Sequence, residues 1–378
     1  MLLGLLLAAV LASVLISRRL CAGASAARVY GSLLGALLVS AGITAGWSLH
    51  RFVTSPQITV WRIVNIVFYG ACWTLPLIFL AAYWILVRFR RRNAGRSGPF
   101  AALVSSATLS IMFGLLVVGM YASWIEPNRI EVTQTSLRTK YLAPGSTPLK
   151  IVQLSDLHID RLGYREKKAL KLVAGLKPDF IFLTGDYTNH LESNPDVRRF
   201  LEGLEARYGV YAVHGNWNQL PEARWVFRDL PITLLHYGAV VVRTKSGRVV
   251  VGGVPWYGAE EAGVCFRKVS TRNSYVILLC HTPDAGLYSP SWVDLVLAGH
   301  THGGQVRLPF IGPIVNFTDV SRDQSVGLTK LPQGSRLYVN RGLGMEGGGA
   351  PRIRLLCRPE ISLFTISPES RNHRGGDG

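Results

Sequence analysis

The stretch Leu297-Ala298-Gly299-His300-Thr301-His302-Gly303-Gly304-Gln305 places two histidines two residues apart, directly after an apolar run. The run predicts a buried strand, and the glycines predict a sharp turn from the strand into a loop. Two imidazoles in this arrangement can turn toward one point, and imidazole is the commonest metal ligand among side chains. A single pair of histidines is equally typical of an ordinary core or surface position. The interpretation therefore depends on whether other parts of the chain supply partners.

Four more apolar runs along the chain also end in short polar clusters. In an open α/β sheet the ligand crevice lies outside the carboxyl ends of the strands, so we expect these clusters to meet at one rim. The clusters are Ser155-Asp156-Leu157-His158, Thr184-Gly185-Asp186, His214-Gly215-Asn216 and Cys280-His281-Thr282-Pro283.

The clusters combine carboxylate, imidazole and amide groups, which suit Mn, Fe, Zn or Mg better than a metal that prefers thiolates. Seven such side chains are too many for one ion, so they predict two divalent ions that share a bridging carboxylate. Two ions about 3.5–4 Å apart form the clamp that many phosphoesterases use. The predicted metal ligands are Asp156, His158, Asp186, Asn216, His281, His300 and His302.

The pattern of residues 150–366 predicts an α/β fold with sheets covered by helices. In its first half, short apolar runs alternate with segments of helical spacing, as in βαβ units. In its second half the runs are mostly predicted strands. The predicted helices span residues 164–176, 197–207 and 221–230.

The first third of the chain carries four apolar runs, at about residues 2–17, 30–49, 63–87 and 101–125. Each run predicts a transmembrane helix, although the first is short. Arginines gather in the loops after the first and third runs. The positive-inside rule then places those loops in the cytoplasm and both termini outside it. No charge lies at mid-depth in a run, so an anchor is favoured over a channel or carrier.

The net charge of +18 has a simple interpretation in this setting. Residues before Arg129 include ten arginines, no lysine and one acid. A basic chain can indicate nucleic acid binding. Here, however, the arginines lie between apolar runs, so we expect a membrane partner and no nucleic acid. The five cysteines include no C-x-x-C pair, which argues against a zinc or redox site; one disulfide among the last three stays open.

These patterns predict four successive parts of the chain. A transmembrane region of four helices covers residues 1–126, and a connector rich in proline and glycine covers 127–148. The catalytic α/β domain covers 149–367 and lies outside the cytoplasm. A polar, glycine-rich tail covers 368–378 and is predicted to be disordered.

The order of the clusters resembles the pattern of the calcineurin-like metallophosphoesterases: D-x-H, then G-D, then G-N-H-[DE], then a histidine, then G-H-x-H. The resemblance covers about residues 150–366. The surroundings of the first and last motifs, and the later Asn340-Arg341-Gly342-Leu343-Gly344, are similar to a bacterial membrane-associated phosphodiesterase branch. The resemblance implies a four-layer α/β/β/α sandwich. It also implies that a hydroxide between two metal ions attacks phosphorus in line.

The resemblance further implies which ligands hold each ion, with Asp186 as the bridge. Asp186, Asn216 and His281 thereby take catalytic roles. The implied ligands of the first ion are Asp156, His158, Asp186 and His302, and those of the second are Asp186, Asn216, His281 and His300.

One position departs from the family pattern. Trp217 stands where the family has a histidine that assists the leaving group, and Asn218 follows it instead of an acid. General-acid help is typically worth ~10²–10⁴ in rate. The leaving group then needs no proton, or another residue such as His214, His190 or Arg341 supplies it, or the site catalyses poorly. The hydrolases that cut the pyrophosphate of UDP-diacylglucosamine are similar, because they also lack this histidine and carry arginine there.

Two hypotheses follow about function. The first is a membrane-anchored two-metal phosphoesterase that hydrolyses a phosphodiester or pyrophosphate, with lipid-linked compounds among its candidate substrates. In this hypothesis Trp217 and Arg341 are candidate substrate contacts, Arg341 because a guanidinium can donate two hydrogen bonds to a phosphate. The second is a membrane receptor or scaffold that binds metal but is weakly active, for which Trp217 is the reason.

Overall fold

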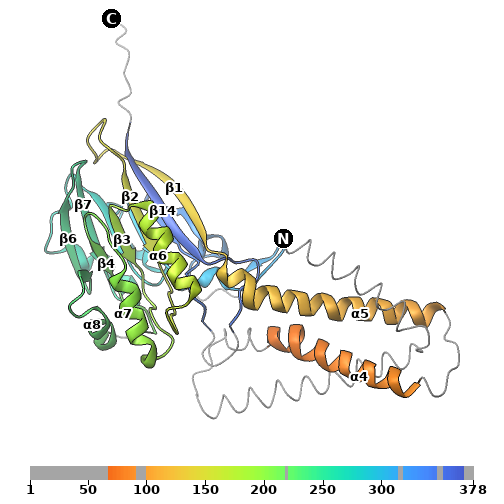
Figure 1. Ribbon diagram of the computed structural model, residues 1–378. Helices are drawn as coiled ribbons and strands as arrows, with labels where there is room; N and C mark the ends of the chain where they lie inside the picture. The colour runs from red at the N-terminus through yellow and green to blue at the C-terminus, as the bar shows by residue number, and fades with distance from the viewer. Residues whose placement is uncertain (1–66, 91–98, 218–219, 314–317, 347–351, 370–378) are drawn as a thin grey trace, which may run out of the picture. The chain divides into compact units, whose positions relative to one another are not determined.

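A computed structural model of the 378-residue chain describes residues 67–90, 99–217, 220–313, 318–346 and 352–369 (Figure 1). The chain divides into two units. The first contains residues 1–125 and 346–353, and the second contains residues 126–345 and 354–378. The predicted spans at 2–17 and 30–49 and most of the predicted tail lie outside the described residues.

The first unit contains two long apolar helices that pack against each other, α4 (Leu75–Arg90) and α5 (Pro99–Met120). A π-helical turn precedes α4, and another, Tyr121–Ile125, follows α5. Phe79, Tyr83, Leu109 and Met112 form a small core between the helices. Apolar character all round a helix is typical of a membrane span or a deeply buried helix.

Within the described part of the chain, one helix is long and apolar enough to cross a membrane, Ser106–Asn128. It corresponds to the fourth predicted span. The third prediction, residues 63–87, coincides with a shorter apolar helix, Val67–Tyr83, that does not reach the same length. The arrangement of four transmembrane helices is therefore not confirmed.

The second unit contains two six-stranded sheets. The order in the first sheet is β1-β14-β2-β3-β4-β5, and in the second it is β12-β13-β9-β8-β7-β6. The strands of the first sheet are β1 (Glu131–Thr139), β14 (Glu360–Pro368), β2 (Leu149–Leu154), β3 (Phe180–Leu183), β4 (Val210–Ala212) and β5 (Ile232–Leu234). Those of the second are β12 (Gly327–Lys330), β13 (Arg336–Val339), β9 (Leu295–Ala298), β8 (Tyr275–Leu279), β7 (Arg248–Gly253) and β6 (Gly238–Arg243).

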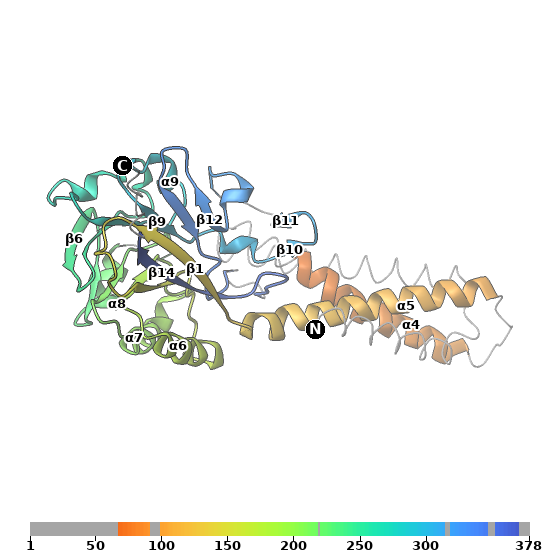
Figure 2. The ribbon, with the colours of Figure 1, turned by 90° about the horizontal axis from the view of Figure 1, so that it is seen from above.

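The helices of this unit cover the outer faces of the two sheets. Figure 2 shows α6, α7 and α8 along one side of the unit and α9 on the opposite side. The sequence predicts α6 with the observed bounds, whereas α7 begins three residues earlier than predicted and ends before Gly203. The helices are α6 (Tyr164–Leu176), α7 (Asn194–Glu202), α8 (Leu220–Phe227) and α9 (Ala285–Tyr288).

Strand alternation builds the core, because successive side chains of a strand point to opposite faces. In β3, Phe180 and Phe182 pack between the two sheets, while Ile181 packs under the helices of the outer face. In β9, Leu297 packs between the sheets and Val296 packs on the far side. These layers confirm the predicted α/β fold of two packed sheets. The four described cysteines are free and buried.

Part of the predicted connector is a strand. Residues 131–139 form β1, which pairs in parallel with β14 along its full length, from Glu131 beside Glu360 to Thr139 beside Pro368. The polar sequence Glu131-Val132-Thr133-Gln134-Thr135 shows no apolar run because β1 is an edge strand with half-exposed side chains. The second unit therefore begins at residue 126, before the predicted boundary at 149.

Candidate metal centre

The predicted ligands follow the carboxyl ends of strands from both sheets. β2, β3 and β4 run parallel in the first sheet and end before Asp156, Asp186 and Asn216, respectively. β8 and β9 run parallel in the second sheet and end before His281 and His300. The rim predicted from the strand ends is therefore present, and it joins the two sheets.

Backbone conformation distinguishes these positions from ordinary loops. Five predicted ligands have a positive φ: 47° at Asp156, 38° at His158, 53° at Asp186, 70° at His300 and 51° at His302. A residue other than glycine rarely adopts this region, and such strain is typical of functional sites, where the surroundings hold it in place. The chain therefore bends at these residues, just after β2, β3 and β9 end.

Two glycines beside the ligands allow the loops to approach closely. A Cβ atom at Gly215 would overlap the carboxylate of Asp186, and one at Gly299 would overlap Ser155 Oγ and the Asp156 carboxylate. No other residue type fits at these two positions without moving a ligand. The motif glycines therefore serve the packing of the centre itself.

One group of ligand atoms involves Asp156, His158 and His302, all buried. His302 Nε2 lies 3.3 Å from Asp156 Oδ1. The His158 and His302 rings lie with their centroids 4.9 Å apart. The donor atoms of these three residues lie within 4.8 Å of one another, so one ion can contact all three.

A second group involves Asp156, Asp186 and His281. His281 Nε2 lies 3.2 Å from Asp186 Oδ2, 3.0 Å from Asn216 Oδ1 and 3.1 Å from His300 Nδ1. Asp186 Oδ2 also lies 3.6 Å from His158 Nε2. Asp156 belongs to both groups, and Asp186 of the second group also reaches toward His158 of the first. The bridging role of Asp186 that the family resemblance implies stays a prediction.

The charges fit a pair of cations. Burial raises the pKa of Asp156 to about 6. Burial also raises the pKa of Asp186, but the charges of His281 and His158 outweigh it and hold that pKa below its usual range. Burial lowers the pKa of His302 far below its usual range, so this imidazole is neutral, as a metal ligand requires. Burial lowers the pKa of His281, but the charges of Asp186 and Asp156 outweigh it and raise that pKa to about 9. The two buried carboxylates and the neutral His302 are donors that suit divalent ions.

Hydrogen bonds outside the ligand set orient the imidazoles. The main-chain carbonyl of Thr184 lies 2.7 Å from His281 Nδ1, so this nitrogen donates to it and Nε2 faces the centre. His158 Nδ1 lies 2.9 Å from Asn189 Oδ1, and Asn189 Nδ2 donates back to His158 O at 2.9 Å. Such partners of metal-bound histidines fix the ring orientation. Sequence reasoning missed Asn189, because only the fold brings its side chain to His158.

Trp217 lies at the centre. Its ring stands edge-on to His158, with the centroids 5.9 Å apart, and its backbone N–H donates to Asp186 Oδ1 at 2.9 Å. Two of the candidates to replace the missing histidine are His214 and His190. His214 Nε2 lies 3.4 Å from His236 Nδ1, and the side chain of His190 is exposed. A substrate contact by Trp217 stays a prediction, but its position is compatible with it.

Arg341 has two carboxylate partners in the second unit. Its Nε donates to Glu360 Oε2 at 2.9 Å and its Nη2 to Glu131 Oε2 at 3.0 Å. Glu360 is buried, and these contacts hold Arg341 next to Gly303 in the loop of His302. A substrate contact by Arg341 therefore stays a prediction that competes with a structural role.

A fully buried arginine supports the same region. Arg354 donates hydrogen bonds to the main-chain carbonyls of Arg341, Gly342, Gly344 and Cys357. The turn at residues 342–344 also contacts the loop of Asp156, because Gly344 N donates to Asp156 O at 2.7 Å. Sequence reasoning did not single out Arg354, which has no local pattern.

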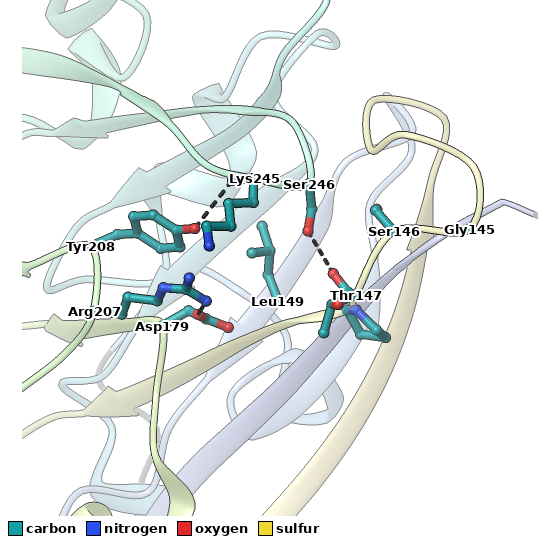
Figure 3. Close-up of a pocket in the computed structure, with 10 residues that line it drawn as sticks. Gly145, Ser146, Thr147, Leu149, Asp179, Arg207, Tyr208, Lys245 and Ser246 are labelled. Carbon is teal, nitrogen blue, oxygen red and sulfur yellow. Dashed lines mark hydrogen bonds and ion pairs between the residues drawn. The ribbon is translucent and has the colours of Figure 1, made fainter.

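A separate pocket of about 250 Å³ lies at the amino ends of β2, β3 and β4, whereas the metal centre lies at their carboxyl ends (Figure 3). Its walls include Arg207 and Tyr208, just before β4, and Lys245, whose backbone N–H donates to Tyr208 Oη at 3.1 Å. Arg207 is 3.9 Å from Asp179. None of the predicted metal ligands lines this pocket, so it is not part of the metal centre.

The two-sheet fold and the buried Asp/His centre define a metal-dependent phosphoester hydrolase. Residues 149–304 match the family model described as calcineurin-like phosphoesterase. An uncharacterised metallophosphoesterase of Bacillus subtilis, YkuE, is 31% identical over 280 residues, covering 68% of this chain and 94% of the relative. The chain therefore belongs to the calcineurin-like metallophosphoesterase family. Enzymes of this family use two divalent metal ions, and the Asp/His groups described above can bind them.

Two further relatives have names that specify a reaction. The phosphodiesterase YaeI of Escherichia coli is 28% identical over 260 residues, covering 65% of this chain and 92% of the relative. The UDP-2,3-diacylglucosamine pyrophosphatase LpxG of Chlamydia muridarum is 27% identical over 331 residues, covering 70% and 98%. The chain is thus similar both to a phosphodiesterase and to a pyrophosphatase.

Proposed function

We propose that this protein is a membrane-anchored two-metal hydrolase that cleaves a phosphodiester or pyrophosphate bond of a lipid-linked substrate outside the cytoplasm. The observation that carries the proposal is the buried centre in which Asp186 Oδ2 lies between His158 and His281. The apolar helix Ser106–Asn128 supports membrane anchoring, and the apolar runs separated by arginines in the sequence support a multi-pass arrangement. The similarity to a diacylglucosamine pyrophosphatase supports a lipid-linked substrate.

In this proposal the ligands divide as the family pattern implies. When bound, two divalent ions would neutralise charge on the phosphoryl group and activate the attacking water. Asp186 stays ionised at neutral pH, and the Trp217 N–H holds its Oδ1, so that its Oδ2 faces the other ligands. The first ion would be held by Asp156, His158, Asp186 and His302, and the second by Asp186, Asn216, His281 and His300.

Trp217 determines which leaving group suits the centre. An indole cannot protonate a leaving oxygen, but its apolar ring beside His158 can form a wall against the substrate. A phosphate that leaves a pyrophosphate bond needs little protonation, whereas an alkoxide needs much more. The tryptophan therefore favours a pyrophosphate or another substrate with a good leaving group.

The purified full-length chain, loaded with Mn²⁺, is expected to hydrolyse a bis-aryl phosphodiester and a nucleoside diphosphate-linked lipid. A chelator should abolish both reactions, and added Mn²⁺ should restore them, because the ligands alone provide no nucleophile. Release of the aryl alcohol from the first substrate and of the nucleoside monophosphate from the second measures turnover. If Mn²⁺, Fe²⁺, Zn²⁺ and Mg²⁺ all fail with both substrates, the proposed hydrolase activity is wrong.

Trp217 also motivates the second candidate, a metal-binding receptor with a degenerate centre. Trp217→His is expected to leave pyrophosphate hydrolysis within about threefold of the native rate, because that leaving group gains little from an acid. Trp225→His, which changes an exposed tryptophan of α8, is the matched control. A gain of ~10² or more on the pyrophosphate substrate would instead favour the degenerate receptor.

A further inference from the structure

The second unit exposes an apolar hairpin tip close to the metal centre. β10 (Arg307–Leu308) and β11 (Gly312–Pro313) form a short antiparallel hairpin. Its tip carries Leu308, Phe310 and Ile311, which are 40%, 110% and 61% exposed; we call these three residues the β10–β11 tip. Phe310 has a φ of 66°, a conformation that is unusual for a bulky residue. The backbone therefore holds an aromatic ring fully in solvent, at a free-energy cost that a partner would offset.

Hydrogen bonds fix the base of this hairpin to the loop of His302. Arg307 N donates to Leu355 O at 2.9 Å, and Leu355 N donates to Gln305 O at 2.9 Å. An Arg307 guanidinium N–H donates to Gly303 O at 3.1 Å. A surface that the tip touches is therefore held near the metal centre.

The second unit begins at the sheet edge that carries the metal centre, as the strand directions show. β14 is antiparallel to β2, so Ser362, near the start of β14, lies beside Gln153, near the end of β2. β1 is parallel to β14 and therefore also starts at the edge where Asp156 lies. The candidate span ends at Asn128, three residues before β1 begins.

The residues at this entrance contact the same loop. The buried carboxylate of Glu126 accepts a hydrogen bond from Cys357 N at 2.9 Å. Cys357 Sγ in turn donates to His302 O at 3.3 Å. Within the second unit, its first residue, Glu126, is thus connected through Cys357 to the loop that carries the hairpin. Because the candidate span ends at Asn128, just before β1, a membrane that holds the span is an apolar surface within a few residues of Glu126 along the chain.

We propose that the β10–β11 tip inserts into the interface of the bilayer in which this chain is anchored, and thereby holds the metal centre at the lipid surface. The inference rests on the proposed function for its lipid-linked substrate. Exposed phenylalanine, leucine and isoleucine side chains beside an arginine are typical of protein segments that lie in the membrane interface. The tip would act as a positioning element and would take no part in the chemical step.

The first test follows the environment of the tip without any turnover. The full chain is placed in nanodiscs of phosphatidylcholine and phosphatidylglycerol in equal parts, with a polarity-sensitive dye on cysteine introduced by Phe310→Cys. We expect a blue-shifted emission that lipids with spin labels on their acyl chains quench. The control is Leu328→Cys on β12, a leucine with 44% exposure that should report water. A water-like emission at 310, or a shift that requires two copies per nanodisc, would overturn the proposal.

The second test separates positioning from chemistry. In nanodiscs, Phe310→Ser combined with Ile311→Ser should raise KM for a lipid-linked pyrophosphate about tenfold or more, as expected for the loss of two buried apolar side chains. kcat, and the turnover of a soluble bis-aryl phosphodiester, should stay unchanged. Equal losses on both substrates would contradict a membrane role. Because the dye measurement needs no catalysis, it still decides the proposal if the hydrolase assay fails.

Discussion

Asp186→Asn is expected to lower kcat for phosphodiester hydrolysis by about 10³-fold or more, since this carboxylate is proposed to bridge both ions. Asp186 is 1% exposed, and its Oδ2 lies 3.6 Å from His158 Nε2 and 3.2 Å from His281 Nε2. An amide of the same shape keeps the packing and removes the negative charge that binds the cations. Loss of charge, and not of fold, should therefore account for the effect.

Metal content and kinetics measured on the same sample check this result. The variant should bind fewer than two ions per chain by elemental analysis, while its circular dichroism stays native. Asp196→Asn is the matched control, because Asp196 pairs with Arg199 on the surface of α7. A variant with two bound ions and native kcat would show that Asp186 is not the bridge.

Arg354→Met is expected to lower the free energy of unfolding of the second unit by about 3 kcal/mol or more, because several buried carbonyl groups lose their donor. Arg354 has no exposed surface, and its guanidinium donates to four main-chain carbonyls, three of them in residues 341–344. Methionine fills similar volume but donates no hydrogen bond. The loosened turn should in turn disturb Asp156, which receives a hydrogen bond from Gly344 N at its main-chain oxygen.

Hydrogen exchange measured by mass spectrometry on the full chain tests this stability effect unit by unit. Peptides from β2 and β14 should exchange faster in Arg354→Met than in the native chain, while peptides from α5 keep their native rate. Arg267→Met, at an exposed arginine, should exchange like the native protein in both units. Native exchange in β2 and β14 of the Arg354 variant would show that its carbonyl contacts contribute little.

The candidate metal ligands could be predicted because each follows an apolar run. A strand end is a local feature, and parallel strands bring their carboxyl ends to one edge, so Asp156, Asp186 and His281 could be placed together without coordinates. The same local reasoning predicted α6 with its observed bounds. It could not find β1, because an edge strand with polar side chains shows no apolar pattern.

The sequence by itself therefore determined the fold class, the family and the set of candidate ligands, because strand alternation and the polar clusters depend on neighbouring residues. The tertiary structure alone decided which distant groups support them. Asn189 reaches His158 across 31 positions, and Cys357 N reaches Glu126 across 231. Such contacts depend on how the sheets and loops pack. No sequence periodicity predicts these hydrogen bonds, because donor and acceptor come together only when the strands and loops have packed.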